Sequence, residues 1–235
     1  MTPLHAPIDY TGAIEVLAII AHELRNPLAA IQFAARSLKA DDLDATRIEQ
    51  VRTLIDRQVQ QVFRITNDLL DVTRVSTGKF ALRKERVDLA TVVLNAMDSC
   101  RATIDAGGLT AILQLPSSTV YVEVDPALMA QVVVNLLDNS VKYSERGGEI
   151  VISVDRGPSE ATIRVCDQGI GIAADAMPHL FELFVRGDCA QSKARGGMGI
   201  GLNVVKRIVQ LHEGTVEAYS AGPGCGSAFT VRVPC

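Results

Sequence analysis

With 235 residues, the chain is long enough for one large domain or two small ones. Aromatic residues make up only 4% of it and tryptophan is absent, so any hydrophobic core must consist mainly of Val, Leu, Ile and Ala. The formal net charge is -4, and no run of Lys and Arg is dense enough to bind nucleic acid or a membrane surface. We therefore expect no nucleic-acid partner.

The chain has no apolar run of the ~18 residues that a membrane span requires, and residues 1–12 lack the basic and apolar parts of a signal peptide. Its five cysteines, Cys100, Cys166, Cys189, Cys225 and Cys235, are scattered and form no CxxC pair. This pattern argues against a disulfide framework and a zinc site, and it favours a reducing compartment. We therefore expect a cytoplasmic chain without a membrane segment.

Two heptad repeats of apolar residues predict a pair of long amphipathic helices. The first repeat places apolar residues at Leu17, Ile20, Leu24, Pro27, Ile31, Ala34 and Leu38, and the second spans residues 48–72. The polar segment 39–46 between them predicts a hairpin loop, with Asp44 or Thr46 as the N-cap of the second helix.

A lone pair of such helices would leave much of both apolar seams in water. The most economical solution is a homodimer in which two hairpins form a four-helix bundle. The alternative is that both helices pack onto the rest of their own chain.

The remainder of the chain alternates strand and helix patterns, which indicates a mixed α/β sandwich as a second domain. We expect a helical hairpin over residues 1–77, a linker over 78–87 and the α/β domain over 88–235. The expected elements of that domain are a helix over 89–106, strands over 110–115 and 119–124, a helix opened by Asp125 and Pro126, a strand hairpin over 148–156 and 160–167, a helix over 200–212, and strands over 214–221 and 227–234.

The first helix carries a candidate reactive histidine. His22 falls at the heptad position that points away from the partner helices, Asn26 shares that outward face one turn on, and Glu23 lies beside the histidine. A single surface histidine on a helix usually has no role. Pro27, however, cannot donate a helical hydrogen bond to the carbonyl of Glu23, so we expect the helix to bend just after His22.

Three further segments carry polar residues or glycines at informative positions. Asn135, Asn139 and Lys142 form one polar edge of an apolar helix, and amide oxygens suit Mg²⁺; the alternative is a polar surface stripe. The segment CDQGIGI over 166–172 places an aspartate at a strand end before two glycines, although such letters also make ordinary tight turns. The glycines of 196–201 precede a helix, where free N–H groups would hold phosphate.

The segment 177–195 lies between the two glycine clusters. Phe181 and Phe184 would anchor it, and Arg186, Lys193 and Arg195 would contact phosphate if it acts as a lid. The alternative is an ordinary surface loop whose phenylalanines fill the core.

The order of these motifs resembles that of the sensor histidine kinases of two-component signalling. A proline-flanked HE..N helix in a heptad hairpin is followed by N...N..KY over 135–143, DxGxGI over 167–172, LFExFxRG over 180–187 and GGxGxGL over 196–202. These are similar to the H, N, G1, F and G2 boxes of that family, and the resemblance covers residues 17–234. Two departures are Met198, where Thr or Ser is frequent, and Ser140, where Ala is frequent.

The resemblance implies an α+β protein with a dimerisation and histidine-phosphotransfer hairpin, followed by a GHKL (Bergerat) α/β sandwich that binds ATP and Mg²⁺. It implies that His22 takes the γ-phosphoryl group of ATP, that Glu23 is the acid/base residue, and that Asn26 aligns a water for dephosphorylation of the partner. Asn139 would bind Mg²⁺. The implied nucleotide contacts are Asn135, Asn139, Lys142, Tyr143, Asp167, Gly169, Gly171, Arg186, Lys193, Gly197, Gly199, Ile200, Gly201 and Leu202.

The implied partners are a second copy of the chain, a response regulator whose aspartate receives the phosphoryl group, and an upstream sensor protein or a sensor domain absent from this chain. Two alternatives stay open. One is an ATPase clamp of the same fold, and the other is a regulator-binding phosphatase scaffold with a silent kinase domain.

Overall fold

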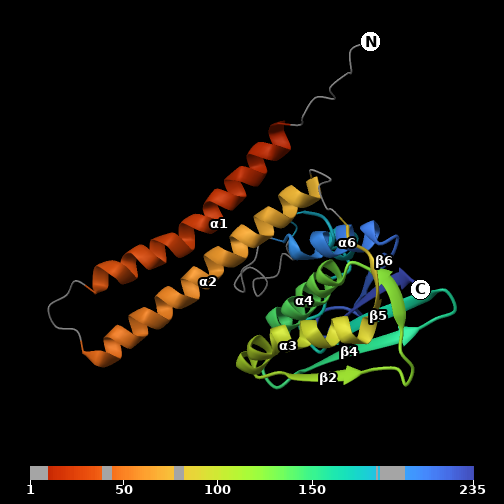
Figure 1. The fold of residues 1–235 in the computed structure, drawn as a ribbon. Helices are drawn as coiled ribbons and strands as arrows, with labels where there is room; N and C mark the ends of the chain where they lie inside the picture. The colour runs from red at the N-terminus through yellow and green to blue at the C-terminus, as the bar shows by residue number, and fades with distance from the viewer. Residues whose placement is uncertain (1–9, 39–43, 77–81, 184, 186–198) are drawn as a thin grey trace, which may run out of the picture. The chain divides into compact units, whose positions relative to one another are not determined.

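The computed structural model describes residues 10–38, 44–76, 82–183, 185 and 199–235, without the side chains of residues 10–19, 23, 64 and 67–76. The chain divides into two compact units, Met1–Thr73 and Arg74–Cys235. Figure 1 shows a helical hairpin in the first unit and a mixed α/β fold in the second. This confirms the fold class expected from the heptads and from the alternating pattern that follows them.

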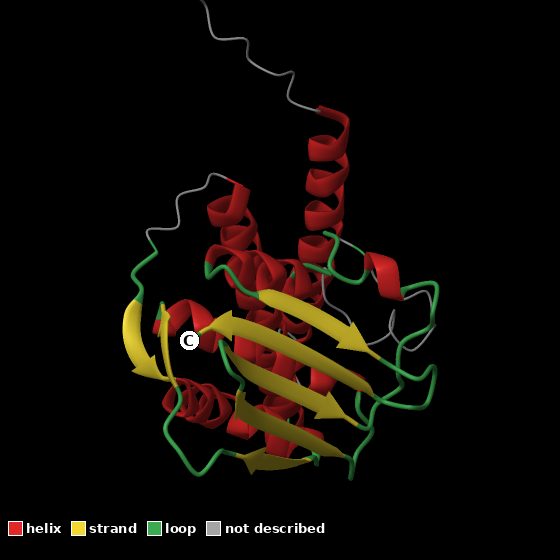
Figure 2. Ribbon diagram, turned by 90° about the vertical axis from the view of Figure 1, so that its right-hand side faces the viewer, coloured by secondary structure: helices red, strands yellow, loops and turns green. Residues whose placement is uncertain are grey.

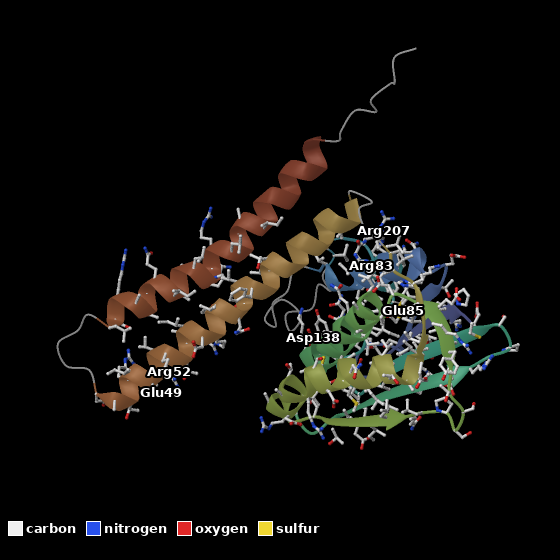
Figure 3. The ribbon with its side chains drawn as sticks, viewed as in Figure 1. Glu49, Arg52, Arg83, Glu85, Asp138 and Arg207 are labelled. Carbon is white, nitrogen blue, oxygen red and sulfur yellow. The ribbon has the colours of Figure 1, made fainter. Side chains whose placement is uncertain are left out.

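The hairpin consists of α1, Tyr10–Ser37, and α2, Ala45–Ser76. Asp44 caps α2, because its carboxylate accepts a hydrogen bond from the backbone N–H of Arg47 at 2.7 Å. Of the two N-caps that the sequence allows, the structure therefore selects Asp44. The first turns of α2 also carry an exposed ion pair between Glu49 and Arg52, 2.7 Å long and labelled in Figure 3.

The heptad positions of the hairpin differ in burial. The residues at one position are buried, namely Ile20, Pro27 and Ala34 of α1 and Val51 and Ile65 of α2. At the other heptad position Leu38 is 40% and Ile48 is 48% exposed, while Leu24, Ile31 and Ile55 are half-buried. Among the described residues of the hairpin, one of the two heptad positions is thus only partly covered.

Pro27 does not end α1, which continues for ten residues beyond it. Its side chain is buried on the inner face of the helix. Figure 1 shows that the axis of α1 changes direction part-way along its length. A continuous but bent helix is what a proline in a helix interior produces when tertiary packing compensates for the missing hydrogen bond.

The second unit contains seven strands, three α-helices and a short 3₁₀ helix among the described residues. In chain order they are β1 Glu85–Asp88, α3 Leu89–Gly107, β2 Thr110–Gln114, β3 Tyr121–Val124, α4 Pro126–Tyr143, β4 Glu149–Arg156, β5 Glu160–Asp167, η1 Met177–His179, α6 Gly201–Leu211, β6 Thr215–Tyr219 and β7 Ser227–Pro234.

Five strands form one sheet in the order β2-β4-β5-β7-β6. The pair β2 and β4 is parallel, and the remaining pairs are antiparallel. The helices α3, α4 and α6 cover one face of this sheet (Figures 1 and 2). Alternate residues of β4, β5 and β7 are buried against them, and Ile152, Ile163 and Val231 are 0% exposed. An aliphatic core, as the composition predicts, holds the two layers together.

Two helices of this unit begin at an aspartate, and one ends at a glycine. Asp88 caps α3 and Asp125 caps α4, each by accepting hydrogen bonds from backbone N–H groups of the first turn. Gly108 ends α3 with a φ of 65°, a conformation that favours glycine. Residues 85–87, at the end of the expected linker, belong to β1, Glu85–Asp88, which pairs antiparallel with β3.

Candidate functional site

His22 and Asn26 are both exposed on α1. They are four residues apart, so their side chains leave the helix on the same face, and the buried Pro27 lies on the opposite side. The side chain of Glu23 lies outside the described residues. The hairpin thus presents an imidazole and an amide together to solvent, where a reacting partner can reach both.

In the second unit, the end of α4 and the loop after β5 are held together by backbone contacts. The N–H of Ile170 donates to the carbonyl of Tyr143 at 3.0 Å. A Cβ atom at Gly169 would lie only 2.5 Å from that same carbonyl oxygen, so this close approach requires glycine. Lys142 and Tyr143, at the end of α4, are therefore brought next to the loop that begins at Asp167.

The Asp167 carboxylate is fixed by three hydrogen bonds. One oxygen accepts from the N–H of Gly169 at 2.9 Å and from the N–H of Ser227 at 3.2 Å. The other oxygen accepts from the Ser227 hydroxyl at 2.6 Å. A carboxylate oxygen has two lone pairs, so this group can still accept a further donor such as an exocyclic amine. Asp167 is half-buried, which keeps it accessible to a ligand.

A second loop, residues 220–226, packs against the loop that begins at Asp167. The N–H of Gly224 donates to Ile170 O at 2.7 Å, and the N–H of Gly226 donates to Gly169 O at 3.1 Å. The Ser220 hydroxyl accepts from the N–H of Ile172 at 3.0 Å. Gly171 has a φ of 69°, and a Cβ atom there would collide with the carbonyl oxygen of the facing loop. These hydrogen bonds and close contacts hold the two loops together.

The N-terminus of α6 has the features of a phosphate site. Gly199 has a φ of 70°, and Ile200, which is 1% exposed, precedes the helix without a side-chain cap for its first N–H groups. Gly201 and Leu202 begin the helix and are half-buried. Uncapped N–H groups and the positive end of the helix dipole favour an anion. Asn135 of α4 lies beside this turn, since its amide donates to Gly201 O at 3.4 Å.

The remaining predicted residues of this site are Asn139, Lys142 and Tyr143, which are half-buried near the end of α4. The Lys142 ammonium lies 4.7 Å from the Tyr143 ring centroid. Asn139 is one turn beyond Asn135 on the same helix. Arg186, Lys193 and Gly197 lie outside the described residues, as do Phe184, Arg195 and Met198. Asn203 of α6 donates to Phe181 O at 2.9 Å, so the start of the predicted lid segment is tied to that helix.

The described residues do not form a site in which acidic, histidine or cysteine side chains alone hold a metal ion. In the part of the chain that the structure describes, no three His, Cys, Asp or Glu side chains cluster closely enough to hold an ion. Amide oxygens such as that of Asn139 are suited to a cation that keeps waters and binds substrate phosphates. Ser140, beside Asn139, has a fully buried hydroxyl without a hydrogen-bond partner among the described residues.

Two matches to protein families agree with this division of the chain. Residues 14–78 match the His Kinase A (phospho-acceptor) domain. Residues 124–235 match the family described as histidine kinase-, DNA gyrase B-, and HSP90-like ATPase. The chain carries the two domains of a sensor histidine kinase catalytic core.

Individual histidine kinases are similar over most of this chain. The sensor-like histidine kinase SenX3 of Mycobacterium tuberculosis is 32% identical over 222 residues, which are 94% of this chain and 53% of SenX3. The sensor protein kinase WalK of Staphylococcus aureus is 30% identical over 224 residues, 94% of this chain and 53% of WalK. The chain thus spans about half the length of the curated relatives it matches.

Solved histidine kinase structures share the fold. The Acinetobacter baumannii histidine kinase AdeS superposes with a TM-score of 0.67 at 25% identity, covering 91% of this chain and 97% of the AdeS chain. Full-length ShkA, solved in complex with AMPPNP, superposes with a TM-score of 0.67 at 26% identity, covering 94% of this chain and 45% of ShkA. In this histidine kinase chain, none of the described helices is both long and apolar enough to cross a membrane.

Sequence reasoning missed Ser227 as a member of the site. Its hydroxyl and its N–H both contact Asp167, although the two residues are 60 positions apart in the chain. The available signal was the glycine-rich stretch at 222–226 just before the last strand, since glycines at a strand start permit close approach of another backbone. In the histidine kinase chain this stretch holds the Asp167 loop in place.

Proposed function

We propose that this chain is an ATP-dependent protein-histidine kinase, which phosphorylates His22 and passes the phosphoryl group to an aspartate of a response regulator. The observation that carries the proposal is the exposed pair His22 and Asn26, on a helix matched to a phospho-acceptor domain, in one chain with an adenine-nucleotide site. Full-length ShkA, with which this chain shares 26% of its residues, was solved with AMPPNP, which supports ATP as the nucleotide.

The transfer to His22 requires a neutral imidazole nitrogen as nucleophile. This nitrogen forms a bond to the γ-phosphorus of ATP while the bond from that phosphorus to the β,γ-bridging oxygen breaks, and ADP leaves. Glu23 accepts the proton from the other ring nitrogen, which fixes the tautomer and raises nucleophilicity. In the second step, an aspartate oxygen of the regulator attacks the same phosphorus and the histidine nitrogen leaves.

The second unit would hold the nucleotide in three places. Asp167 would accept a hydrogen bond from the adenine amino group, which explains why three donors orient its carboxylate. The uncapped start of α6, together with Gly197 and Gly199, would bind the phosphates. Mg²⁺, bound through Asn139 and the phosphates, would offset negative charge on the transferring group. Lys142, Arg186 and Lys193 would add positive charge there.

The proposal includes two protein partners. A second copy of the chain would cover the apolar seam that each hairpin leaves open, and a response regulator would dock on the face that carries His22 and Asn26. Asn26 would align a water for the removal of phosphate from that regulator. An upstream sensor protein or sensor domain would control the hairpin. Because ATP is a cytoplasmic metabolite, the proposal also places this part of the chain in the cytoplasm.

A labelling experiment tests the proposal. The purified 235-residue chain is incubated with γ-labelled ATP and Mg²⁺, and the protein is then treated with acid or with base. If the label is on a phosphohistidine, we expect acid to remove it and base to leave it on the protein. Transfer of that label to a receiver domain would support the second step. Release of inorganic phosphate without label on the protein would favour an ATPase clamp, and binding without turnover would favour a silent scaffold.

Neutralising Asp167 should weaken nucleotide binding. In Asp167→Asn the amide oxygen can still accept the N–H bonds of Gly169 and Ser227, so the loop should keep its shape. The charge-assisted bond to adenine is lost, and we expect the Kd for ATP to rise about 10- to 100-fold. Isothermal titration measures the change. The matched control is Asp155→Asn, an exposed aspartate on β4, which should bind as the wild type does.

The dimer is tested at Ile48, which is 48% exposed in a single hairpin. In a monomer, a glutamate at this position would be exposed to water. In a dimer with two-fold symmetry, the glutamates of both copies would be buried in the interface. We expect Ile48→Glu to raise the dimer dissociation constant about 10- to 100-fold. Sedimentation equilibrium measures it, and Thr53→Glu, on the outward face of α2, is the control. A monomeric wild type, or equal dissociation constants for both variants, would remove the dimer from the proposal.

A further inference from the structure

His212 is the buried residue that directly follows α6, with 2% of its surface exposed. Each ring nitrogen has one hydrogen-bond partner. Nδ1 lies 2.8 Å from the carbonyl oxygen of Ile208, and Nε2 lies 2.9 Å from the backbone nitrogen of Asp125. A carbonyl can only accept and a backbone N–H can only donate, so Nδ1 must carry the proton and Nε2 must be bare. Only this neutral tautomer satisfies both bonds.

The partner of Nε2 lies at a junction of the fold. Asp125 ends β3 and caps α4, and its carboxylate accepts from the N–H groups of Ala127 at 3.1 Å and Leu128 at 3.2 Å. The other carboxylate oxygen accepts from the N–H of Arg83 at 3.0 Å, in the segment that leads into β1 (Figure 3). The imidazole thus bonds the end of α6 to the start of α4, and the Asp125 carboxylate in turn bonds to the segment before β1.

A second bond joins the same two helices at the other end of α6. The Asn135 amide donates to Gly201 O at 3.4 Å. On α4 the two bonds are 10 residues apart, at Asp125 and Asn135, and on α6 they are 11 apart, at Gly201 and His212. At 1.5 Å per residue, these separations correspond to about 15 and 17 Å. The helices therefore run antiparallel with two bonds at matching spacing, and sliding one along the other breaks at least one bond.

Burial of His212 favours its neutral form. Burial lowers the pKa of His212, and the nearby Lys84 lowers it further, whereas the Ile208 carbonyl and the Asp125 carboxylate act in the opposite direction. Lys84 itself forms an ion pair of 2.8 Å with Glu213. The bond to Asp125 is therefore complete above the ordinary histidine pKa of about 6.5 and is lost as the pH falls through the lowered pKa of the folded state.

We propose that His212 is a positioning residue of the nucleotide site, because its bond to Asp125 fixes the register of α4 against α6. The helix α4 carries Asn135 and Asn139, and α6 supplies the phosphate-binding turn at Gly199 and Gly201, so this register sets how the two parts meet the nucleotide. The inference rests on the proposed ATP site. It makes nucleotide affinity dependent on a histidine that touches neither substrate nor metal.

Two neutral variants separate the bonds of His212. The amide of glutamine reaches the position of Nε2, so His212→Gln can still accept from the Asp125 N–H. The amide of asparagine reaches only the position of Nδ1, so His212→Asn keeps the bond to Ile208 within its own helix and loses the bond to α4. Isothermal titration with Mg²⁺ and AMPPNP is carried out on the wild type and both variants from pH 5.5 to 8.0.

At pH 7.5 we expect His212→Gln to bind within about twofold of the wild type and His212→Asn to bind about tenfold more weakly. Nucleotide phosphates titrate in the same pH range, so the ratio of wild-type to His212→Gln affinity is the informative quantity. This ratio should fall as the pH decreases through the lowered pKa of His212, because only the wild type loses its acceptor.

Equal affinities of the two variants at pH 7.5 would overturn the inference, since the bond between the helices would then be irrelevant. A ratio of wild type to His212→Gln affinity that stays constant as His212 becomes protonated, as followed by its ring proton signals in NMR, would overturn it as well, even if His212→Asn does not fold. If the wild type itself binds no AMPPNP at any pH, the proposed ATP site fails instead, and circular dichroism of the same samples shows whether the unit is folded.

Discussion

Replacing His22 with glutamine is expected to reduce the phosphoryl label on the protein to below about 1% of the wild-type level. The reason is that the glutamine amide cannot act as the nucleophile in place of the imidazole. Glutamine is similar in size and uncharged, and His22 is exposed, so the hairpin should keep its stability. The affinity for ATP should remain within about twofold of the wild type, since the nucleotide contacts lie in the other unit. Quantitative autoradiography and isothermal titration measure the two quantities.

The matched control is His5→Gln, which changes a histidine outside both matched regions, residues 14–78 and 124–235. It should be labelled like the wild type. Label that survives in His22→Gln would contradict the proposed phosphoacceptor. Loss of label in both variants would point to a general effect of the substitution on the protein.

Replacing Gly171 with alanine is expected to eliminate nucleotide binding, with a rise in Kd of more than about 100-fold. The residue has a φ of 69°, which is unfavourable for alanine, and its Cβ would collide with the carbonyl oxygen of Gly222. Either the loop after β5 or the loop 220–226 must move, and the hydrogen bond from Gly224 to Ile170 would break. Asp167 would then lose its orientation. Titration with ATP measures the loss.

The control for Gly171→Ala is Gly147→Ala. Gly147 also has a positive φ, of 88°, but nothing lies within 4 Å of the position that its Cβ would occupy. This variant carries the same kind of backbone penalty, about 1 kcal/mol, without a collision. If both variants bind ATP equally well, the packing of the two loops is not what orients Asp167. Thermal unfolding of both proteins separates loss of fold from loss of the site.

Local patterns in the sequence predict the hairpin and most of the second unit. The heptad repeat correctly places Ile20, Ala34 and Val51 in the buried seam and His22 on the exposed face. Asp88 and Asp125 were identifiable as N-caps, because a short acidic side chain before an apolar helix pattern has one favoured use. These features depend on residues within one or two turns of each other.

The features that the sequence did not reveal depend on residues far apart in the chain. The strand β1 consists of only Glu85–Asp88, and three of these residues are charged. It forms because its backbone pairs with that of β3. Ser227 joins the site only because β7 pairs with β5. The tautomer of His212 is set by Asp125, a residue 87 positions away. Periodicity and propensity contain no information about such pairings.

The position of β7 also determines when each unit can fold. This strand is paired on both sides, with β5 and β6, and it follows every other strand in the chain. Its contact between Asp167 and Ser227 spans 60 positions, whereas α1 and α2 are joined by a short loop. During synthesis at roughly 5–20 residues per second, the hairpin is complete well before β7 leaves the ribosome. In the proposed dimer, two nascent hairpins could therefore associate before either chain is able to hold a nucleotide.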